Sequence, residues 1–203
     1  MNKQLNIHKK IILASESPRR RNLLALLGLD FDVKPAFIDE DSIIMEGTPE
    51  EYVQKLSLLK AKKIADEEKT DTIVIGADTI VVLENQVLNK PIDESDAYKM
   101  LRRLSGKTHQ VYTGIALVEA LKGNSFTTYK KTDVSFRYLE DEEILSYIKS
   151  GSPLDKAGSY GIQDDFGAVF VSHINGCYYN IVGLPLELLY TSLKMFSENK
   201  SKE

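Results

Sequence analysis

Cysteine and histidine are scarce in this sequence, which contains one cysteine, three histidines and no tryptophan among 203 residues. A lone cysteine, Cys177, cannot form an internal disulfide bond or build a thiolate zinc site. Because no base lies beside it in the sequence, we interpret Cys177 as a structural residue. The histidines (His8, His109 and His173) lack the spacing of metal ligands. Neither a Ser-His-Asp nor a Cys-His arrangement is indicated, and a Walker A sequence is also absent.

An excess of basic residues is missing as well. The chain has 26 Lys and Arg against 30 Asp and Glu, which gives a net charge of −4. A nucleic-acid-binding surface usually needs a basic excess, and aromatic residues are not interleaved with basic ones here. No apolar run approaches the ~20 residues of a membrane span, and the run at 11–14 is too short for a signal-peptide core. We therefore expect a cytoplasmic protein that binds neither nucleic acid nor membrane.

The composition is that of a globular protein, with 42% hydrophobic and 28% charged residues. We expect a single domain over residues 1–203, with any two lobes sharing one sheet. Strand-like and helix-like segments alternate, which predicts a mixed α/β fold whose strand order the pattern does not settle. Strands are expected at 11–14, 31–34, 72–75, 79–83, 111–118, 127–138, 168–171 and 178–182. Helices are expected at 18–27, 49–66, 94–104, 140–149 and 185–196.

The segment 15–21, Ser-Glu-Ser-Pro-Arg-Arg-Arg, joins the first strand to the first helix. Ser17 is suited to cap this helix, with Pro18 at its first position. A helix N-terminus carries free N–H groups and partial positive charge, so each arginine there opposes the dipole by about 0.3–1 kcal/mol. A bound phosphate would remove this conflict, and guanidinium groups suit phosphate oxygens. The segment therefore predicts a phosphate site, the alternative being a solvated basic turn.

Asp78 interrupts the apolar stretch 72–83. A buried carboxylate is costly unless it is paired or bound to metal. Gly76 and Ala77 are expected to leave the neighbouring backbone open to a ligand. Asp78 is therefore suited to hold a divalent cation or to take a proton from an attacking water. The alternative is an aspartate in a turn between two strands.

Weaker signals come from a glycine-containing loop and from isolated charged residues. In the loop 155–163, Lys156 is suited to a phosphate and Gln163 to a base edge, although such loops are mostly plain loops. The acidic stretch 37–41 would suit a metal but is usually just solvated. Lone lysines such as Lys60 and Lys90 are usually surface residues.

Taken together, these segments resemble the Maf family of nucleoside triphosphate pyrophosphatases. The matching segments follow the family order over nearly the whole chain: 13–20 (LASESPRR), 76–79 (GADT), 90–91 (KP), 104–106 (LSG), 155–163 (DKAGSYGIQ) and 182–185 (VGLP). The resemblance implies a mixed sheet with flanking helices and two lobes around a cleft, related to the inosine triphosphate pyrophosphatase fold. It also implies cleavage between the α and β phosphates and a requirement for a divalent metal, Mg or Mn.

The resemblance assigns roles to individual residues. Asp78 matches the catalytic acid/base and, with Glu40, a metal-binding position. Positions matching the substrate site are Ser15, Arg19, Arg20, Lys60, Thr79, Lys90, Lys156 and Gln163. Specificity in the family tracks Arg19, Thr79 and Gln163, which here match the branch acting on dTTP and UTP. The branch acting on 7-methyl-GTP typically differs at these places, for instance with Trp after the Ser-Pro.

Alternatives to this activity remain open. The substrate of such an enzyme would be 7-methyl-GTP, another nucleotide, or a modified nucleotide removed in a house-cleaning role. A protein of another class would bind nucleotides without turnover, for example as a regulator of septum formation. A homodimer is compatible with the family, although the sequence carries no interface signature.

Overall fold

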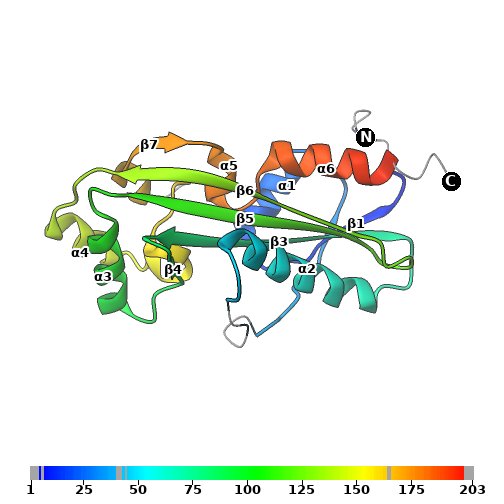
Figure 1. Cartoon of the computed structure of the whole chain (residues 1–203), viewed down its shortest axis with the longest axis horizontal. Helices are drawn as coiled ribbons and strands as arrows, with labels where there is room; N and C mark the ends of the chain where they lie inside the picture. Colours follow the sequence, from blue (N-terminus) through cyan, green and yellow to red (C-terminus); the bar gives the residue numbers. More distant parts are fainter. Residues whose placement is uncertain (1–4, 6, 40–42, 44, 164–165, 199–203) are drawn as a thin grey trace. The chain divides into compact units, whose positions relative to one another are not determined.

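The computed structural model describes residues 5, 7–39, 43, 45–163 and 166–198, in which strands and helices alternate (Figure 1). The strands are β1 (Lys10–Leu13), β2 (Asp32–Val33), β3 (Thr72–Leu83), β4 (Gln86–Leu88), β5 (Thr108–Glu119), β6 (Ser125–Phe136) and β7 (Val171–Asn175). The α-helices are α1 (Pro18–Ala25), α2 (Pro49–Glu67), α3 (Glu94–Leu104), α4 (Asp141–Lys149), α5 (Tyr178–Val182) and α6 (Leu186–Glu198). Short 3-10 helices are η1 (Ser152–Asp155), η2 (Ala157–Ser159) and η3 (Phe166–Phe170).

The strands of the described residues form one seven-stranded mixed sheet in the order β2-β1-β3-β5-β6-β7, with β4 paired to β3. β1 runs parallel to both β2 and β3, and its Leu13 lies opposite Val33 on one side and Ile75 on the other. The pairs β3–β4 and β6–β7 are antiparallel. The predicted mixed α/β fold, with a mixed sheet and flanking helices, is confirmed.

The chain divides into two compact units. Unit 1 consists of Met1–Asp78, Thr113–Lys130 and Gly183–Glu203, and unit 2 consists of Thr79–Tyr112 and Lys131–Val182. In unit 1, α2 lies on one side of the strands and α1 and α6 lie on the other (Figure 1). Under α2, a hydrophobic cluster joins Ala61 and Ile64 of the helix to Ile12 of β1 and Val74 of β3.

Helix starts follow the predicted capping residues. Ser17 caps α1 through its side chain, which accepts a hydrogen bond from the backbone N–H of Arg20. Thr48 and Glu51 form the reciprocal capping box of α2, and Asp93 caps α3. Each cap satisfies backbone donors that have no partner within the helix, which is why these local signals were reliable.

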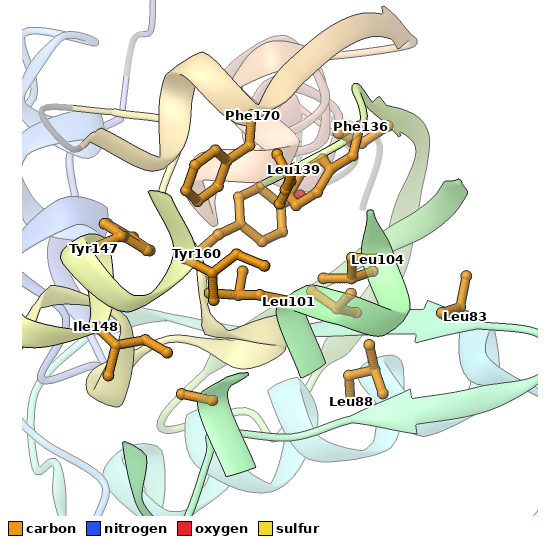
Figure 2. Packing of buried hydrophobic residues seen from close by; sticks show 14 of the residues in the cluster. Leu83, Leu88, Leu101, Leu104, Phe136, Leu139, Tyr147, Ile148, Tyr160 and Phe170 are labelled. Atoms are coloured by element: carbon orange, nitrogen blue, oxygen red, sulfur yellow. The ribbon is translucent and has the colours of Figure 1, made fainter. Parts of the chain in front are cut away.

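The core of unit 2 is a cluster of aromatic and aliphatic side chains (Figure 2). Phe136 of β6 packs edge-on against the ring of Tyr160, with ring centroids 4.8 Å apart. Phe170 makes an edge-to-face contact with Tyr147 of α4, at 5.2 Å. Edge-to-face pairs of this kind contribute about 0.5–1.5 kcal/mol beyond the area that they bury. The cluster therefore fixes the loop that contains Tyr160 to the sheet and to α4.

Two predicted strands near the C-terminus are wrong. Residues 168–171 fall mainly in the 3-10 helix η3, and the strand there is β7, which begins at Val171. Residues 178–182 form the helix α5, despite their two tyrosines and two β-branched residues. In α5 the buried Asn180 donates hydrogen bonds from Nδ2 to the carbonyl of Val111 and to Oγ1 of Thr132, both at 2.9 Å. Such tertiary contacts outweigh the weak β propensity of five residues.

The predicted break between strands 72–75 and 79–83 is also wrong, because β3 runs without interruption from Thr72 to Leu83. Glycine and aspartate suggested a turn, since both are disfavoured in strands. The structure instead keeps Gly76 extended and buried beneath α2, and Asp78 is an interior strand residue. The turn lies further on, at Glu84 and Asn85, whose φ angles of 53° and 63° connect β3 to β4.

Candidate functional site

Two predicted site residues of unit 1, Ser15 and Asp78, lie beyond the position where the pairing of β1 with β3 ends. Leu13 ends β1 and pairs with Ile75 of β3, and the N–H of Ala14 donates to the carbonyl of Ile75 at 2.8 Å. Ser15 is thus two residues beyond this paired position on β1, and Asp78 is three residues beyond it on β3. Ligands of open α/β sheets bind outside the carboxyl ends of the strands, so this edge is the expected place for a site.

The first turn of α1 carries the basic residues at this edge. Ser17 ends the link from β1, and its N–H donates to Oγ of the buried Ser15 at 3.2 Å. Arg19 and Arg20 follow at the start of the helix and are both half-buried, whereas Arg21 is exposed. No acidic residue lies in this first turn. The structure therefore confirms the predicted strand-to-helix link and places two half-buried arginines at a helix N-terminus, where an anion is favoured.

Arg20 also holds this turn in place. Its Nε donates to the carbonyl of Gly183 at 2.9 Å, and its Nη1 donates to Oγ of Ser15 at 3.4 Å. Gly183 belongs to the segment 182–185, another of the segments that carried the family resemblance. These contacts fix the orientation of the guanidinium group and connect α1 to the segment that precedes α6.

The approach of α2 to β3 depends on Gly76. A Cβ atom at this position would lie 2.1 Å from the carbonyl oxygen of Ser57 and 2.9 Å from Cβ of Ala61, both on α2. Only glycine allows the helix backbone to come this close. The prediction that Gly76 leaves room for a ligand is thus corrected, because the space is filled by α2. Alternate residues of a strand face the same side, so Asp78 also points toward α2.

Lys60, on α2 between Ser57 and Ala61, meets Asp78. Its Nζ lies 2.6 Å from Oδ1 of Asp78, and the two side chains are only 10% and 6% exposed. This ion pair supplies the partner that a carboxylate inside an apolar strand requires. The family resemblance had placed Lys60 at the substrate site. It did not indicate that Lys60 pairs with Asp78. The helical spacing that places Lys60 on the buried face of α2 was the available signal.

In unit 2, Lys90 and Lys156 lie on neighbouring segments. The N–H of Gly158 donates to the carbonyl of Asn89, which precedes the exposed Lys90. Lys156 is half-buried, and its ammonium group contacts the carbonyl of Ser152 and lies 2.7 Å from Oδ1 of Asp155. The segments 89–90 and 156–158 are therefore hydrogen-bonded neighbours.

Gln163 ends the glycine-containing loop with an unsatisfied group. Its side-chain oxygen Oε1 is buried and has no hydrogen-bond partner within the part of the chain that the structure describes. A buried acceptor without a partner costs about 1–3 kcal/mol, so such a group is suited to receive a donor from a ligand. Thr79, half-buried on β3, follows Asp78 and so points to the opposite face of its strand.

The metal site is only partly described. Glu40 lies outside the described residues, and among those described no group of three or more His, Cys, Asp or Glu residues is arranged to hold a metal ion. Magnesium in proteins is often held by one or two carboxylates together with substrate phosphates. The buried carboxylate of Asp78 is a ligand of the kind that such an ion takes.

Comparison with known proteins identifies the class to which this chain belongs. A family model described as Maf-like protein matches residues 10–196, and the chain belongs to the Maf family. A dTTP/UTP pyrophosphatase from Bacillus cereus is 50% identical over 189 residues, covering 93% of this chain and 91% of the relative. A dTTP/UTP pyrophosphatase from Clostridium beijerinckii is 46% identical over 185 residues, covering 91% of this chain and 98% of the relative.

Among solved structures, a HAM1 protein from Coxiella burnetii is similar to this chain at 15% identity and a TM-score of 0.49. The similarity covers 92% of this chain and 99% of that protein. None of the helices in the described part of this chain combines the length and the apolar character that a membrane span requires.

Proposed function

We propose that this protein is a nucleoside triphosphate pyrophosphatase that hydrolyses dTTP and UTP to the monophosphate and pyrophosphate. The observations that carry the proposal are the buried Lys60–Asp78 pair beyond the end of the β1–β3 pairing and the two half-buried arginines at the start of α1. Relatives at 46–50% identity over more than nine-tenths of the chain are named dTTP/UTP pyrophosphatases. The activity for which these relatives are named supports the same substrates here.

In this proposal the first turn of α1 binds the triphosphate. Its free N–H groups and the guanidinium groups of Arg19 and Arg20 offset phosphate charge. The hydrogen bonds of Arg20 to Ser15 and Gly183 hold its guanidinium group in a fixed orientation before the substrate arrives. Groups oriented in advance stabilise developing charge without reorganising during the reaction, which is the main source of catalysis in phosphoryl transfer.

Asp78 acts as the general base in this proposal. Its carboxylate takes a proton from the water that attacks the α phosphorus. Lys60 fixes one carboxylate oxygen through the 2.6 Å contact, which leaves Oδ2 to face the metal ion and the attacking water. A divalent metal ion, Mg or Mn, would be held by Asp78 and Glu40 and would offset phosphate charge.

The remaining contacts are assigned from the motifs of unit 2. Lys90 and Lys156 are proposed as phosphate contacts, and Gln163 as a reader of the base through its unpartnered Oε1. Arg19 and Thr79 complete the set that favours dTTP and UTP over 7-methyl-GTP. An amide that accepts one hydrogen bond and donates another suits the N3–H and a carbonyl oxygen of thymine or uracil, whereas cytosine has no N3–H to donate.

The test is a panel of nucleotides incubated with the purified protein and with magnesium or manganese. The panel contains dTTP, UTP, CTP, GTP, ITP and 7-methyl-GTP, and both pyrophosphate and monophosphate are quantified. Preferred release of pyrophosphate from dTTP and UTP is expected. Preference for 7-methyl-GTP would keep the reaction and reject the assigned specificity, whereas tight nucleotide binding without turnover would favour a regulatory binding protein.

A further inference from the structure

His109 is a buried residue of unit 2 to which the proposed reaction gives no role. It lies on β5 with no exposed surface, and its Nε2 is 2.7 Å from the hydroxyl group of Tyr160. Its other ring nitrogen, Nδ1, is buried and has no hydrogen-bond partner among the described residues. Tyr160 lies in the middle of the 156–163 segment, which begins at Lys156 and ends at Gln163.

An imidazole in this position destabilises the folded protein. Burial lowers the pKa of His109 to about 3, so the ring is neutral and carries a single N–H. Either Nδ1 or Nε2 carries that proton, and in both cases the buried Nδ1 finds no partner, which costs about 1–3 kcal/mol. A phenylalanine or leucine would fill similar space without this cost. The compensating contact of the ring is its hydrogen bond to Tyr160.

Aromatic packing holds this hydrogen bond in place. Phe136 makes edge-to-face contacts with both partners, at 5.0 Å from the ring of His109 and 4.8 Å from the ring of Tyr160. Figure 2 shows Phe136, Phe170 and Tyr160 gathered in one cluster. Because the rings are packed on several sides, the two polar groups cannot turn toward other partners.

The 156–163 segment has a backbone that needs such support. Ser159 is fully buried and adopts a φ of +61°, a left-handed conformation that costs a residue with a side chain about 1–2 kcal/mol. Gly158 is also left-handed, and a Cβ atom there would lie 3.0 Å from Val81. Conformations of this kind persist only where the surroundings impose them.

Contacts on both sides of Tyr160 impose this conformation. The N–H of Gly161 donates to the hydroxyl group of Tyr147 at 3.2 Å, and Oγ of Ser159 contacts the sulfur of Met100 at 3.2 Å. The His109–Tyr160 hydrogen bond lies between these contacts and reaches the segment from β5 of the sheet. It connects the middle of the segment directly to a rigid element.

We propose that His109 is a positioning residue that fixes the 156–163 segment through Tyr160 and thereby sets how Gln163 discriminates between nucleotide bases. This role rests on the proposed function of Gln163. His109 itself touches no substrate in this proposal. Loss of its hydrogen bond loosens the segment, so a base that is poorly matched to Gln163 is rejected less strongly.

The test compares His109→Phe, His109→Gln, Tyr160→Phe and the double variant His109→Phe/Tyr160→Phe. The preference for UTP over CTP, measured as the ratio of kcat/KM values, is expected to fall by about five- to tenfold in each of the two Phe variants. The loss is expected mainly in KM for UTP. The double variant should lose no more than either single variant, because both remove the same hydrogen bond. His109→Gln keeps a polar group near the hydroxyl and should retain part of the preference.

A matched control separates positioning from general stability. Ile144→Val removes one methylene group from the same hydrophobic cluster without a change at His109 or Tyr160, and it costs about 0.5–1.5 kcal/mol. It should lower the melting temperature and leave the UTP to CTP ratio unchanged. If Ile144→Val lowers the ratio as much as Tyr160→Phe does, the role of His109 is merely structural and the proposal is overturned.

Hydrogen–deuterium exchange tests, independently of activity, whether His109 fixes the 156–163 segment. Tyr160→Phe and His109→Phe should each increase exchange in peptides covering 156–163 and leave α2 of unit 1 unchanged. Unchanged exchange in this segment overturns the positioning role, whether or not the wild-type protein releases pyrophosphate. A third outcome is that exchange increases in the two variants but the wild-type protein does not hydrolyse UTP. In that case His109 still positions the segment, while the proposed function fails, and the claimed effect on base discrimination fails with it.

Discussion

Lys60 and Asp78 form an ion pair of 2.6 Å between α2 and the middle of β3, with side chains that are 10% and 6% exposed. The pair explains how a carboxylate is tolerated within the buried strand β3. Two charges removed from water are stable together only if each keeps its partner. The same pair therefore contributes to the stability of unit 1 and contains the proposed catalytic base. Stability is tested by replacing Lys60, and catalysis is tested by replacing Asp78.

Removal of the ammonium group should destabilise the protein strongly. Lys60→Met preserves most of the side-chain volume but leaves the Asp78 carboxylate buried without its ion-pair partner, which is expected to lower the free energy of unfolding by about 3–5 kcal/mol. Urea unfolding followed by circular dichroism measures this change. The double variant Lys60→Met/Asp78→Leu removes both charges and should recover much of the loss.

The control for Lys60→Met is an exposed ion pair. Lys107 lies 2.8 Å from Glu84, and these side chains are 44% and 61% exposed. Lys107→Met should change the free energy of unfolding by less than about 1 kcal/mol. Equal effects of the two substitutions would contradict the importance given to the buried pair.

Replacement of the carboxylate itself should lower activity strongly and also reduce stability, because the buried Lys60 keeps its charge without its ion-pair partner, but the protein should remain folded. Asp78→Asn keeps the shape of the side chain and an oxygen that accepts from Lys60, but it cannot take a proton from water. We expect kcat for pyrophosphate release from UTP to fall by at least about 10²-fold, the usual contribution of a general base. Circular dichroism should still show the folded protein.

Asp133→Asn is the matched control for this change. Asp133 is also a strand residue, on β6, and it lies 3.7 Å from the exposed Lys131. Its substitution should leave kcat within about twofold of the wild-type value, because Asp133 has no role in the proposed reaction, and it should cost little stability, because surface ion pairs contribute little. Near-full activity of Asp78→Asn would remove Asp78 from the proposed mechanism.

Local chemistry made the helix starts and the strand-to-helix link predictable from the sequence. Capping by Ser17 and Thr48 depends on residues within one helical turn, so tertiary contacts hardly alter it. The structure of Gly76 and Asp78 was not predictable in this way. Their extended conformation results from the packing of α2, and nothing in the neighbouring sequence marks which helix will lie above them.

The candidate site shows the same contrast between features that local sequence predicts and features that depend on distant segments. The sequence identified Asp78, Arg20 and Lys60 by residue type and motif. It did not identify the partners of these groups, because the carbonyl of Gly183 and the ammonium of Lys60 reach them from segments distant in the chain. The importance of His109 was missed for the same reason, since its partner Tyr160 lies 51 residues away.

Stability should decrease in mild acid because of His109. Its pKa is lowered to about 3 by burial, whereas an unfolded histidine has a pKa near 6.5. As the pH falls below about 6.5, the unfolded chain takes up a proton that the folded protein does not, so stability present above that pH is lost progressively down to about pH 3. Between pH 6.5 and 5.0 this loss amounts to about 2 kcal/mol.

The contribution of His109 is isolated by comparing the wild type with His109→Phe. Urea unfolding at several pH values should show a shallower pH dependence for the variant. Glu143, whose pKa is lowered to about 2 by Arg137, stays ionised in the folded protein between pH 6.5 and 5.0. Because Glu143 is the same in both proteins, it does not contribute to the difference between their pH dependences. Parallel curves for the two proteins would show that His109 does not remain neutral in the folded state.

Gly76→Ala should break the contact that brings Lys60 to Asp78. The added methyl group would meet the carbonyl oxygen of Ser57 at 2.1 Å, and a helix backbone cannot move aside as a flexible side chain does. We expect a loss of about 3 kcal/mol or more in the free energy of unfolding, or failure to fold, because overpacking of a close contact forces backbone shifts. In any folded fraction, displacement of α2 should also lower kcat for UTP.

Gly123→Ala provides the comparison, since no atom lies within 4 Å of a Cβ added there. Its φ of +70° makes alanine unfavourable by about 1 kcal/mol, so this substitution should cost far less and leave kcat unchanged. A Gly76→Ala protein as stable and active as Gly123→Ala would mean that α2 does not lie directly against β3 at this position. The Lys60–Asp78 pair would then lack the close helix packing from which its geometry follows.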